Sequence, residues 1–294
     1  MSLSPNIPED PAPDIPEHPA PDSEPNSRRI PNLGHALLFI SLAGMMLAIS
    51  ELLLVAVWGQ PTIEHGGAIQ VVHPKLQIAA EGATYGITLL IAFFLYPFLW
   101  KRSFLDGLRW NWSAARHQAV KLVSLGFALG VTSALVDNFI STSKPQPIDQ
   151  FFLKASDAWV VTFFGVIVAP LFEEICFRGF LVPALAIAYD WVSLPRTPES
   201  QMRWQSTTTL SPLSLIFSAI VTSLVFSLIH GAQVGFAWGA MIVLFSVSLI
   251  LTLVRVKTQS VAASTMVHMA YNAFIFVAMI LWTGGYRHLD RMGH

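Results

Sequence analysis

Charged residues are scarce in this 294-residue sequence, because Asp, Glu, Lys and Arg together make up only 12% of it while hydrophobic residues make up 53%. Soluble domains carry about 25% charged residues. The formal net charge of −1 gives no information on nucleic acid, and no basic cluster with interleaved aromatics is present, so we expect no nucleic-acid partner. A mean hydropathy of +0.56 instead predicts an integral membrane protein whose main partner is the lipid bilayer.

Cysteine occurs only once, at Cys176. A single cysteine excludes an intrachain disulfide and a metal site built from several cysteines. Two glutamates precede Cys176 closely, and acidic surroundings disfavour the reactive thiolate. We therefore interpret Cys176 as a small buried residue rather than as a nucleophile.

Residues 1–32 differ in composition from the rest of the chain, since they hold 9 of the 19 prolines and 6 of the 18 acidic residues. Such a segment has too little apolar surface to form a core, so we predict a disordered, acidic, Pro-rich tail. It has neither the basic start nor the apolar run of a signal peptide, and we expect it to be retained.

Seven apolar runs are each about 20 residues or longer, the length that a bilayer core of about 30 Å requires. These runs predict an all-α, polytopic transmembrane bundle of about seven spans, within a range of six to eight spans. The fourth run is longer than one crossing needs, and Pro170 and Pro183 are places where it can bend. The runs cover residues 34–57, 78–100, 118–140, 158–188, 212–232, 235–254 and 260–282.

Basic residues in the short loops fall on one side of this seven-span arrangement. Cytoplasmic loops carry the excess of Lys and Arg, so we predict a cytoplasmic N-terminus in the plasma (inner) membrane. Arg287 and Arg291 disagree, because an odd number of spans places them outside. The residues on the predicted inner side are Arg28, Arg29, Lys101, Arg102, Arg109, Arg116, Arg196, Arg203, Arg255 and Lys257.

Three charged residues, Glu173, Glu174 and Arg178, interrupt the fourth run. A charge near the bilayer centre costs about 2.5–3.5 kcal/mol on insertion scales, so such side chains normally face a polar cavity and mark function. Glu174 and Arg178 are four residues apart, share one helical face and can pair. One arginine neutralises one carboxylate, which leaves Glu173 free to act as a base or a ligand.

Two other runs each carry a motif one helical turn long. The fifth holds Phe226 and His230, and the seventh holds His268 and Asn272. With the glutamates and the arginine, these residues form a set that can activate water and stabilise an oxyanion. The carboxylate and the two imidazoles could equally hold a divalent metal, with zinc as a candidate.

Each motif alone is weak evidence, because a histidine in a membrane helix is commonly hydrogen-bonded to a neighbouring helix and a Glu–Arg pair can be structural. The span boundaries also put His230 and His268 at depths that differ by on the order of 10 Å. A common site then requires shifted boundaries, a bent fourth span or a deep conical cavity.

The three motifs in this order, Glu-Glu-x-x-x-Arg, Phe-x-x-x-His and His-x-x-x-Asn, resemble those of the CPBP intramembrane proteases. That family includes the type II CAAX prenyl endopeptidases and the Abi and bacteriocin-immunity proteins. The resemblance covers residues 158–283 as a catalytic core, preceded by N-terminal transmembrane helices at 33–157. Every motif residue matches, at Glu173, Glu174, Arg178, Phe226, His230, His268 and Asn272.

The resemblance implies hydrolysis of peptide bonds in membrane-bound or lipidated substrates, prenylated CAAX-type proteins among them. Glu173 with His230 would activate the attacking water or bind the metal that does, Glu174 and Arg178 would hold the site together, and His268 and Asn272 would stabilise the oxyanion. A metal ligated by Glu173, His230 and His268 would be gathered from three helices, since the sequence lacks the His-Glu-x-x-His helix of ordinary zinc proteases.

Two other classes of function stay open from the sequence. Intramembrane Glu, Arg and His also form ion or proton pathways in transporters, although no inverted repeat is apparent here. A catalytically idle, immunity-type binding protein would keep the same fold and the same motifs.

Overall fold

The computed structural model describes residues 29–59, 62–65, 68–71, 73–140 and 147–292. Within these ranges the chain is helical apart from one short hairpin, in which β1 (Thr62–His65) pairs antiparallel with β2 (Ala68–Val71). The predicted tail lies outside the described residues except for its last part, residues 29–32.

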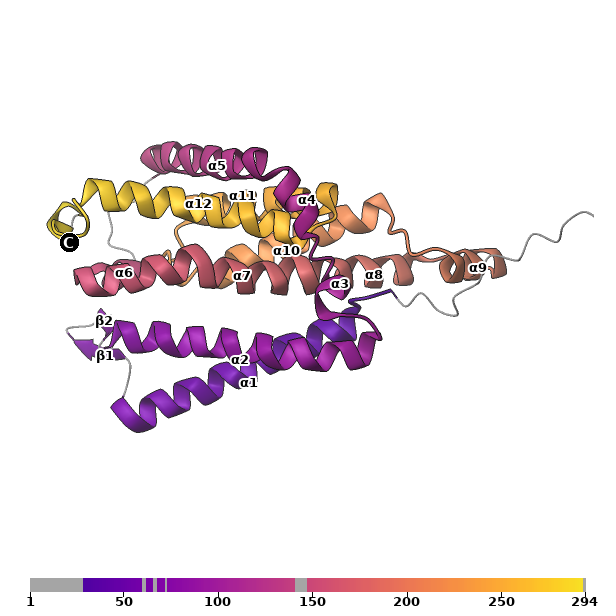
Figure 1. Cartoon of the computed structure of the whole chain (residues 1–294), viewed down its shortest axis with the longest axis horizontal. Helices are drawn as coiled ribbons and strands as arrows, with labels where there is room; N and C mark the ends of the chain where they lie inside the picture. Colours follow the sequence, from indigo (N-terminus) through magenta and orange to yellow (C-terminus); the bar gives the residue numbers. More distant parts are fainter. Residues whose placement is uncertain (1–28, 60–61, 66–67, 72, 141–146, 293–294) are drawn as a thin grey trace, which may run out of the picture.

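Seven helical runs in the described part are long and apolar enough to cross a membrane, which confirms the predicted all-α, multi-pass fold. Figure 1 shows them running side by side as a bundle. Short helices and 3₁₀ turns connect them: α3 (Phe104–Leu108), α4 (Trp112–His117), η1 (Pro147–Phe152), α9 (Pro198–Ser206) and η4 (Leu289–Met292). The spanning runs are α1 (Leu33–Trp58), α2 (Pro74–Trp100), α5 (Ala119–Ile140), a composite helix over residues 155–193, α10 (Pro212–Ile229), α11 (Trp238–Thr258) and α12 (Val261–Trp282).

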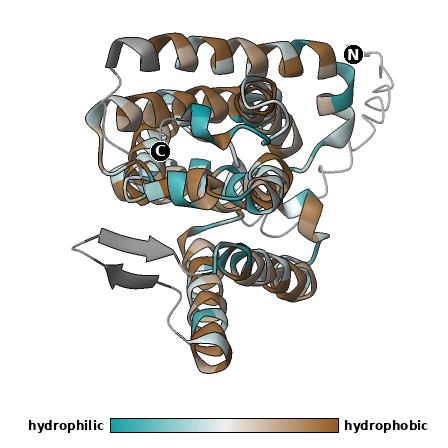
Figure 2. Cartoon of the chain, turned by 90° about the vertical axis from the view of Figure 1, so that its left-hand side faces the viewer, coloured by the Kyte–Doolittle hydropathy of each residue, from teal (hydrophilic) through white to brown (hydrophobic). Residues whose placement is uncertain are grey.

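Most of the helical residues are apolar (Figure 2), and many large apolar side chains are exposed on the outside of the bundle. Leu52 on α1, Phe98 on α2 and Leu281 on α12 are 70%, 75% and 76% exposed. In water such a surface would drive aggregation, whereas lipid tails solvate it. The tryptophans lie near the ends of the spans or in the loops beyond them, where aromatic belts form at the membrane surface. They are Trp58, Trp100, Trp110, Trp112, Trp159, Trp191, Trp204, Trp238 and Trp282.

The composite helix runs without a break through two wide π-helical turns. It consists of α6 (Ala155–Phe163), η2 (Phe164–Val168), α7 (Ala169–Glu174), η3 (Ile175–Leu181) and α8 (Val182–Ser193). Pro170 and Pro183 each stand two residues after the end of a π turn. Proline has no N–H and its ring crowds the carbonyl four residues earlier, so a wider turn relieves the clash. The two prolines therefore widen the helix on both sides of α7.

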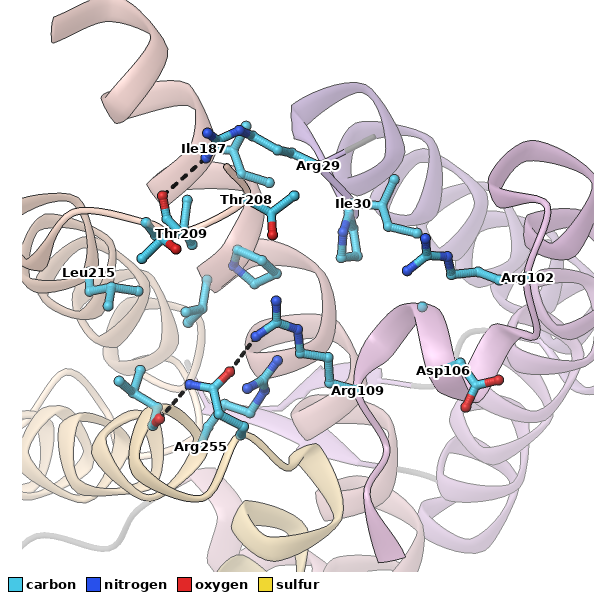
Figure 3. Close-up of a pocket in the computed structure, with 17 residues that line it drawn as sticks. Arg29, Ile30, Arg102, Asp106, Arg109, Ile187, Thr208, Thr209, Leu215 and Arg255 are labelled. Carbon is cyan, nitrogen blue, oxygen red and sulfur yellow. Dashed lines mark hydrogen bonds between the residues drawn. The ribbon is translucent and has the colours of Figure 1, made fainter. Parts of the chain in front are cut away.

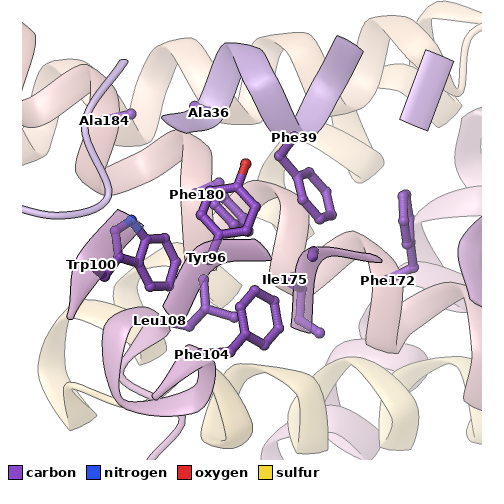
Figure 4. Close-up of a cluster of buried hydrophobic side chains, with 11 residues drawn as sticks. Ala36, Phe39, Tyr96, Trp100, Phe104, Leu108, Phe172, Ile175, Phe180 and Ala184 are labelled. Atoms are coloured by element: carbon purple, nitrogen blue, oxygen red, sulfur yellow. The ribbon is translucent and has the colours of Figure 1, made fainter. Parts of the chain in front are cut away.

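An aromatic cluster joins α1, α2 and α3 to the composite helix (Figure 4). The ring of Phe39 on α1 stacks on that of Phe180 in η3, with centroids 4.4 Å apart, and Trp100 at the end of α2 stacks on Phe104 at 6.0 Å. Phe39 and Phe180 have no exposed surface. The cluster fixes the N-terminal helices against the segment that carries both glutamates.

Two glycines let α5 approach α12 closely. A Cβ added at Gly126 would lie 2.5 Å from the carbonyl oxygen of Val267 and 2.6 Å from the Cβ of Ala270, and one at Gly130 would lie 2.5 Å from the ring of Phe274. Small residues four apart are typical of close helix contacts in membranes. Because His268 follows Val267 on α12, this contact also fixes the position of that imidazole.

We expect Gly126→Ala to force α5 away from α12 and to lower the free energy of unfolding by about 1–3 kcal/mol, the cost of overpacking. The matched control is Gly86→Ala on α2, where an added Cβ meets nothing within 4 Å. Thermal unfolding of the purified chain in detergent measures both variants. Equal melting temperatures for the two variants would contradict the close α5–α12 contact.

Candidate active site

Glu174 and Arg178 form an ion pair with no exposed surface. The Nη1 of Arg178 donates to Oε1 of Glu174 at 2.8 Å, and its Nη2 donates to the backbone carbonyl and the hydroxyl of Ser248 on α11 at 2.7 and 2.8 Å. The spacing of four residues places both charges on one helical face, as the sequence predicts. The guanidinium therefore ties the composite helix to α11.

His268 of α12 joins this pair. Its Nδ1 lies 3.0 Å from Oε1 of Glu174, and the residue is 4% exposed. A carboxylate accepts, so Nδ1 is the protonated nitrogen of the neutral ring. The hydrogen bond orients His268 so that its Nε2 lies 3.8 Å from Oε2 of Glu173.

The carboxylate of Glu173 lies between two imidazoles. Its Oε1 is 3.6 Å from Nε2 of His230, whereas its other oxygen, Oε2, makes the contact with His268. His230 uses its Nδ1 to donate to the carbonyl of Phe226 at 2.8 Å, because a carbonyl can only accept. In their neutral forms both rings thus present an unprotonated Nε2 to a carboxylate. Acceptors that face one another across more than 3.5 Å are satisfied by a bridging donor such as water.

Exposure separates the members of this cluster. The side chains of Glu173 and His230 are 15% and 16% exposed, whereas those of Glu174 and Arg178 are completely buried. Water or a substrate can therefore reach Glu173 and His230. The buried side of the site consists of Glu174, Arg178 and His268.

Phe226 of α10 positions both imidazoles. Its ring stacks on that of His230 with centroids 4.4 Å apart and meets that of His268 edge-on at 6.0 Å. Phe177 packs edge-on against it at 5.1 Å, and the guanidinium carbon of Arg178 lies 5.2 Å from its centroid. Phe226, the aromatic residue of the second motif, is thus a buried side chain that limits how the imidazoles of His230 and His268 can rotate.

Asn272, the last residue of the motifs, supports the backbone of the composite helix. Its Nδ2 donates to the carbonyl of Gly165 at 2.7 Å. In η2 the N–H of Ala169 reaches back five residues to Phe164, so the next carbonyl, that of Gly165, would need an N–H from Pro170, which has none. One amide N–H of Asn272 replaces that missing donor, and the second remains for another partner.

The difference in depth expected between the two histidines is absent. Both Nε2 atoms lie within 4 Å of Glu173, because α10 ends at Ile229 and α11 begins only at Trp238. The predicted boundaries of 212–232 and 235–254 were wrong there. Residues 230–237 form turns, with positive φ at Gly235 and Phe236, so His230 caps a short helix inside the bundle.

The sequence analysis did not include Glu81 of α2 in the site. The hydroxyl of Tyr85 donates to its Oε1 at 2.6 Å, and the Glu81 carboxylate lies near enough to Glu173 and His230 to interact electrostatically with both. The ring of Tyr85 stacks on Phe172 with centroids 3.9 Å apart. A glutamate one turn before a tyrosine inside an apolar run is the signal that could have identified this wall of the site.

The proposed metal ligands have suitable chemistry, with one carboxylate and two imidazole nitrogens. However, each imidazole faces a different oxygen of Glu173, at 3.6 and 3.8 Å. Among the described residues, no group of three or more His, Cys, Asp and Glu side chains is arranged to hold a metal ion. The structure thus gathers the three predicted ligands from three helices, and their role in binding a metal stays a prediction.

We expect Arg178→Met to lower the free energy of unfolding by about 3–5 kcal/mol, because it leaves the buried Glu174 carboxylate without its cation. Adding Glu174→Gln removes that uncompensated charge, so the double variant should be more stable than Arg178→Met alone. The interaction free energy between Glu174 and Arg178 follows from thermal unfolding in detergent of four proteins: the wild type, both single variants and the double variant. Additive effects would show that the two groups are not an energetic pair.

One of the comparisons with known proteins gives a match. Residues 155–274 match the family model described as type II CAAX prenyl endopeptidase Rce1-like, a stretch that begins with α6 and ends within α12. It contains all seven motif residues and leaves out α1 to α5. No curated protein and no solved structure matches the chain. Residues 155–274 of this multi-pass membrane protein are therefore similar to the Rce1-like family of type II CAAX prenyl endopeptidases.

Proposed function

We propose that this chain hydrolyses peptide bonds of membrane-associated proteins, prenylated CAAX-type substrates among them, with a water molecule that Glu173 activates. The observation that carries the proposal is the position of Glu173. Its carboxylate lies 3.6 and 3.8 Å from two imidazole nitrogens and is accessible, whereas the rest of the ion-pair cluster is buried. A base must be reachable by water and held in one orientation, and Glu173 meets both requirements.

In the proposed reaction a water molecule lies between Glu173 and His230. Glu173 takes a proton from this water as its oxygen attacks the scissile carbonyl carbon. The resulting tetrahedral oxyanion is stabilised by His268 and by the second amide N–H of Asn272. The C–N bond then breaks, and Glu173 returns its proton to the leaving amine, so that water is added across the peptide bond.

The role of His268 in this scheme requires a proton on its Nε2. Its Nδ1 is held by Oε1 of Glu174, which directs Nε2 toward the space beside Glu173. Arg178 in turn holds Glu174 by donating to the same oxygen. The buried ion pair thus acts on the reaction through the orientation of His268.

We also propose that the chain lies in the plasma (inner) membrane with its N-terminus in the cytoplasm. Basic residues from the N-terminus, from the α2–α4 region and from the end of α11 line one pocket, so these segments share one end of the bundle. An excess of basic residues at one end is the usual mark of the cytoplasmic side.

We expect Glu173→Gln to lower turnover by about 10²–10⁴-fold while preserving the fold, because the amide keeps the size of the side chain but cannot take a proton from water. A fluorogenic farnesylated peptide, incubated with the purified chain in detergent, reports cleavage. Glu51→Gln on α1 is the control, since it removes another intramembrane carboxylate. Wild-type turnover in the Glu173 variant would rule out its role as the base.

We expect turnover to remain within about twofold of its starting value after treatment with the chelator 1,10-phenanthroline, because no step of the proposed reaction uses a metal. The same farnesylated peptide measures this. Loss of turnover that zinc restores would instead assign Glu173, His230 and His268 to a divalent metal.

A further inference from the structure

A second polar site lies at the end of the bundle where α1 begins. It is a pocket of about 470 Å³ between α3, α8, the segment before α10 and the end of α11 (Figure 3). Val182, which lines it, follows Glu173 by nine residues, or about 13 Å along a helix. The pocket is therefore separate from the candidate active site. Its basic residues are Arg29, Arg102, Arg109 and Arg255.

The charge of this pocket is unbalanced. Asp106 is its single acidic lining residue among those described, and the carboxylate already accepts from the hydroxyl of Ser103 at 2.6 Å. In Figure 3 the Asp106 carboxylate lies at the edge of the pocket, away from Arg109 and Arg255. Four guanidinium groups thus share one cavity with a single, engaged lining carboxylate, while Asp190, outside the lining, attracts Arg29 electrostatically. Like charges that line one pocket repel one another, and a bound anion relieves this repulsion.

Arg255 shows most clearly that a partner is missing. The residue is 6% exposed, and within the described part of the chain its buried Nε has no hydrogen-bond partner and its guanidinium makes no ion pair. The charged group that acts electrostatically on the Arg255 guanidinium is another cation, Arg109. A buried charge normally requires a paired opposite charge, so this guanidinium is placed for an anionic ligand.

Two other arginines are held in place by the protein. Arg29 donates to the carbonyls of Trp204, Thr207 and Thr209, and Arg109 donates to the side chain of Gln259. A guanidinium has five N–H groups, so both arginines keep donors for a ligand. Arg102 is exposed at the rim and makes no hydrogen bond to another described residue. The arginines of the pocket are thus partly preorganised, and Arg102 and Arg255 keep their donors for a ligand.

The remaining wall of the pocket is apolar. Ile30, Val182, Ile187, Leu215 and Val256 line it. Trp100, Trp110 and Trp112 mark the same end of the bundle, at the level where aromatic residues meet lipid headgroups. A free phosphate ion would leave this apolar wall unused. An anionic group joined to a hydrocarbon chain would contact both walls.

We propose that this pocket binds the phosphate group of an anionic phospholipid at the membrane surface. The arginine forks would bind its non-bridging oxygens, and the glycerol and first acyl carbons would lie along the apolar wall. Basic pockets between membrane helices are suited to such headgroups. The bound lipid would neutralise Arg255 and join the N-terminus of α1 to α3, α8 and α11.

The test measures which lipid the full-length chain retains. Delipidated protein in detergent is mixed with equal amounts of phosphatidylglycerol and phosphatidylcholine, and native mass spectrometry gives the ratio of the two bound lipids. We expect the wild type to prefer phosphatidylglycerol, and Arg255→Gln and Arg102→Gln each to reduce the ratio about fivefold, the contribution of one arginine near an anionic lipid. Arg102 is exposed, so its variant is informative even if the Arg255 variant folds poorly.

Arg116→Gln is the matched control, because Arg116 is exposed on α4 at the same end but does not line the pocket. Its ratio should equal that of the wild type. If the Arg116 variant lowered the ratio of bound lipids as much as the pocket variants do, the preference would come from diffuse surface charge, and the proposed binding site would be wrong. Inorganic phosphate that displaces the lipid completely at millimolar concentration would overturn the lipid assignment. Residues 2–27 carry six acidic residues. If the protein retained phosphatidylglycerol only after these residues were deleted, the pocket would be assigned to the chain's own tail instead of a lipid.

Discussion

The buried pair of Glu174 and Arg178 is the interaction on which the rest of the site depends. Its energetic cost is high, because two charges lose their solvation where neither water nor lipid headgroups can reach. Hydrogen bonds offset part of that cost, because Arg178 also reaches the backbone and the hydroxyl of Ser248 on α11. Its Nε and Oε2 of Glu174 have no hydrogen-bond partner among the described residues. Glu174 in turn fixes His268 of α12. One guanidinium thus determines the relative position of three helices, and through them the space around Glu173.

The second constraint comes from the backbone of the composite helix. Pro170 and Pro183 remove two N–H donors from a helix that has no water to replace them. The chain responds with two π turns and, at Gly165, with a side-chain donor from α12. Asn272 therefore has a structural use that its place in a catalytic motif does not reveal. A change at Asn272 would disturb both the proposed oxyanion site and the helix that carries Glu173.

Much of the fold could be predicted from the sequence, because an apolar run of about 20 residues leaves few alternatives in a bilayer. The pairing of Glu174 with Arg178 followed in the same way from a spacing of four residues. The end of α10 was missed because apolar residues continue on both sides of His230, Gly231, Gln233 and Gly235, and the positive φ angles at Gly235 and Phe236 show the turn only in the structure. Glu81 was missed for a related reason: its distance from Glu173 depends on how α2 packs against α7, and no local pattern encodes that packing.

The packing of α2 also bears on the extent of the functional unit. Residues 155–274 contain every motif residue, yet their aromatic face at Phe172 and Phe180 is covered by α1 and α2. Without those helices this face would lie open to lipid, and one wall of the site, built from Tyr85 and Glu81, would be missing. The Glu81 carboxylate also lies near enough to Glu173 to interact with it electrostatically. The N-terminal helices therefore form one wall of the site as well as its support.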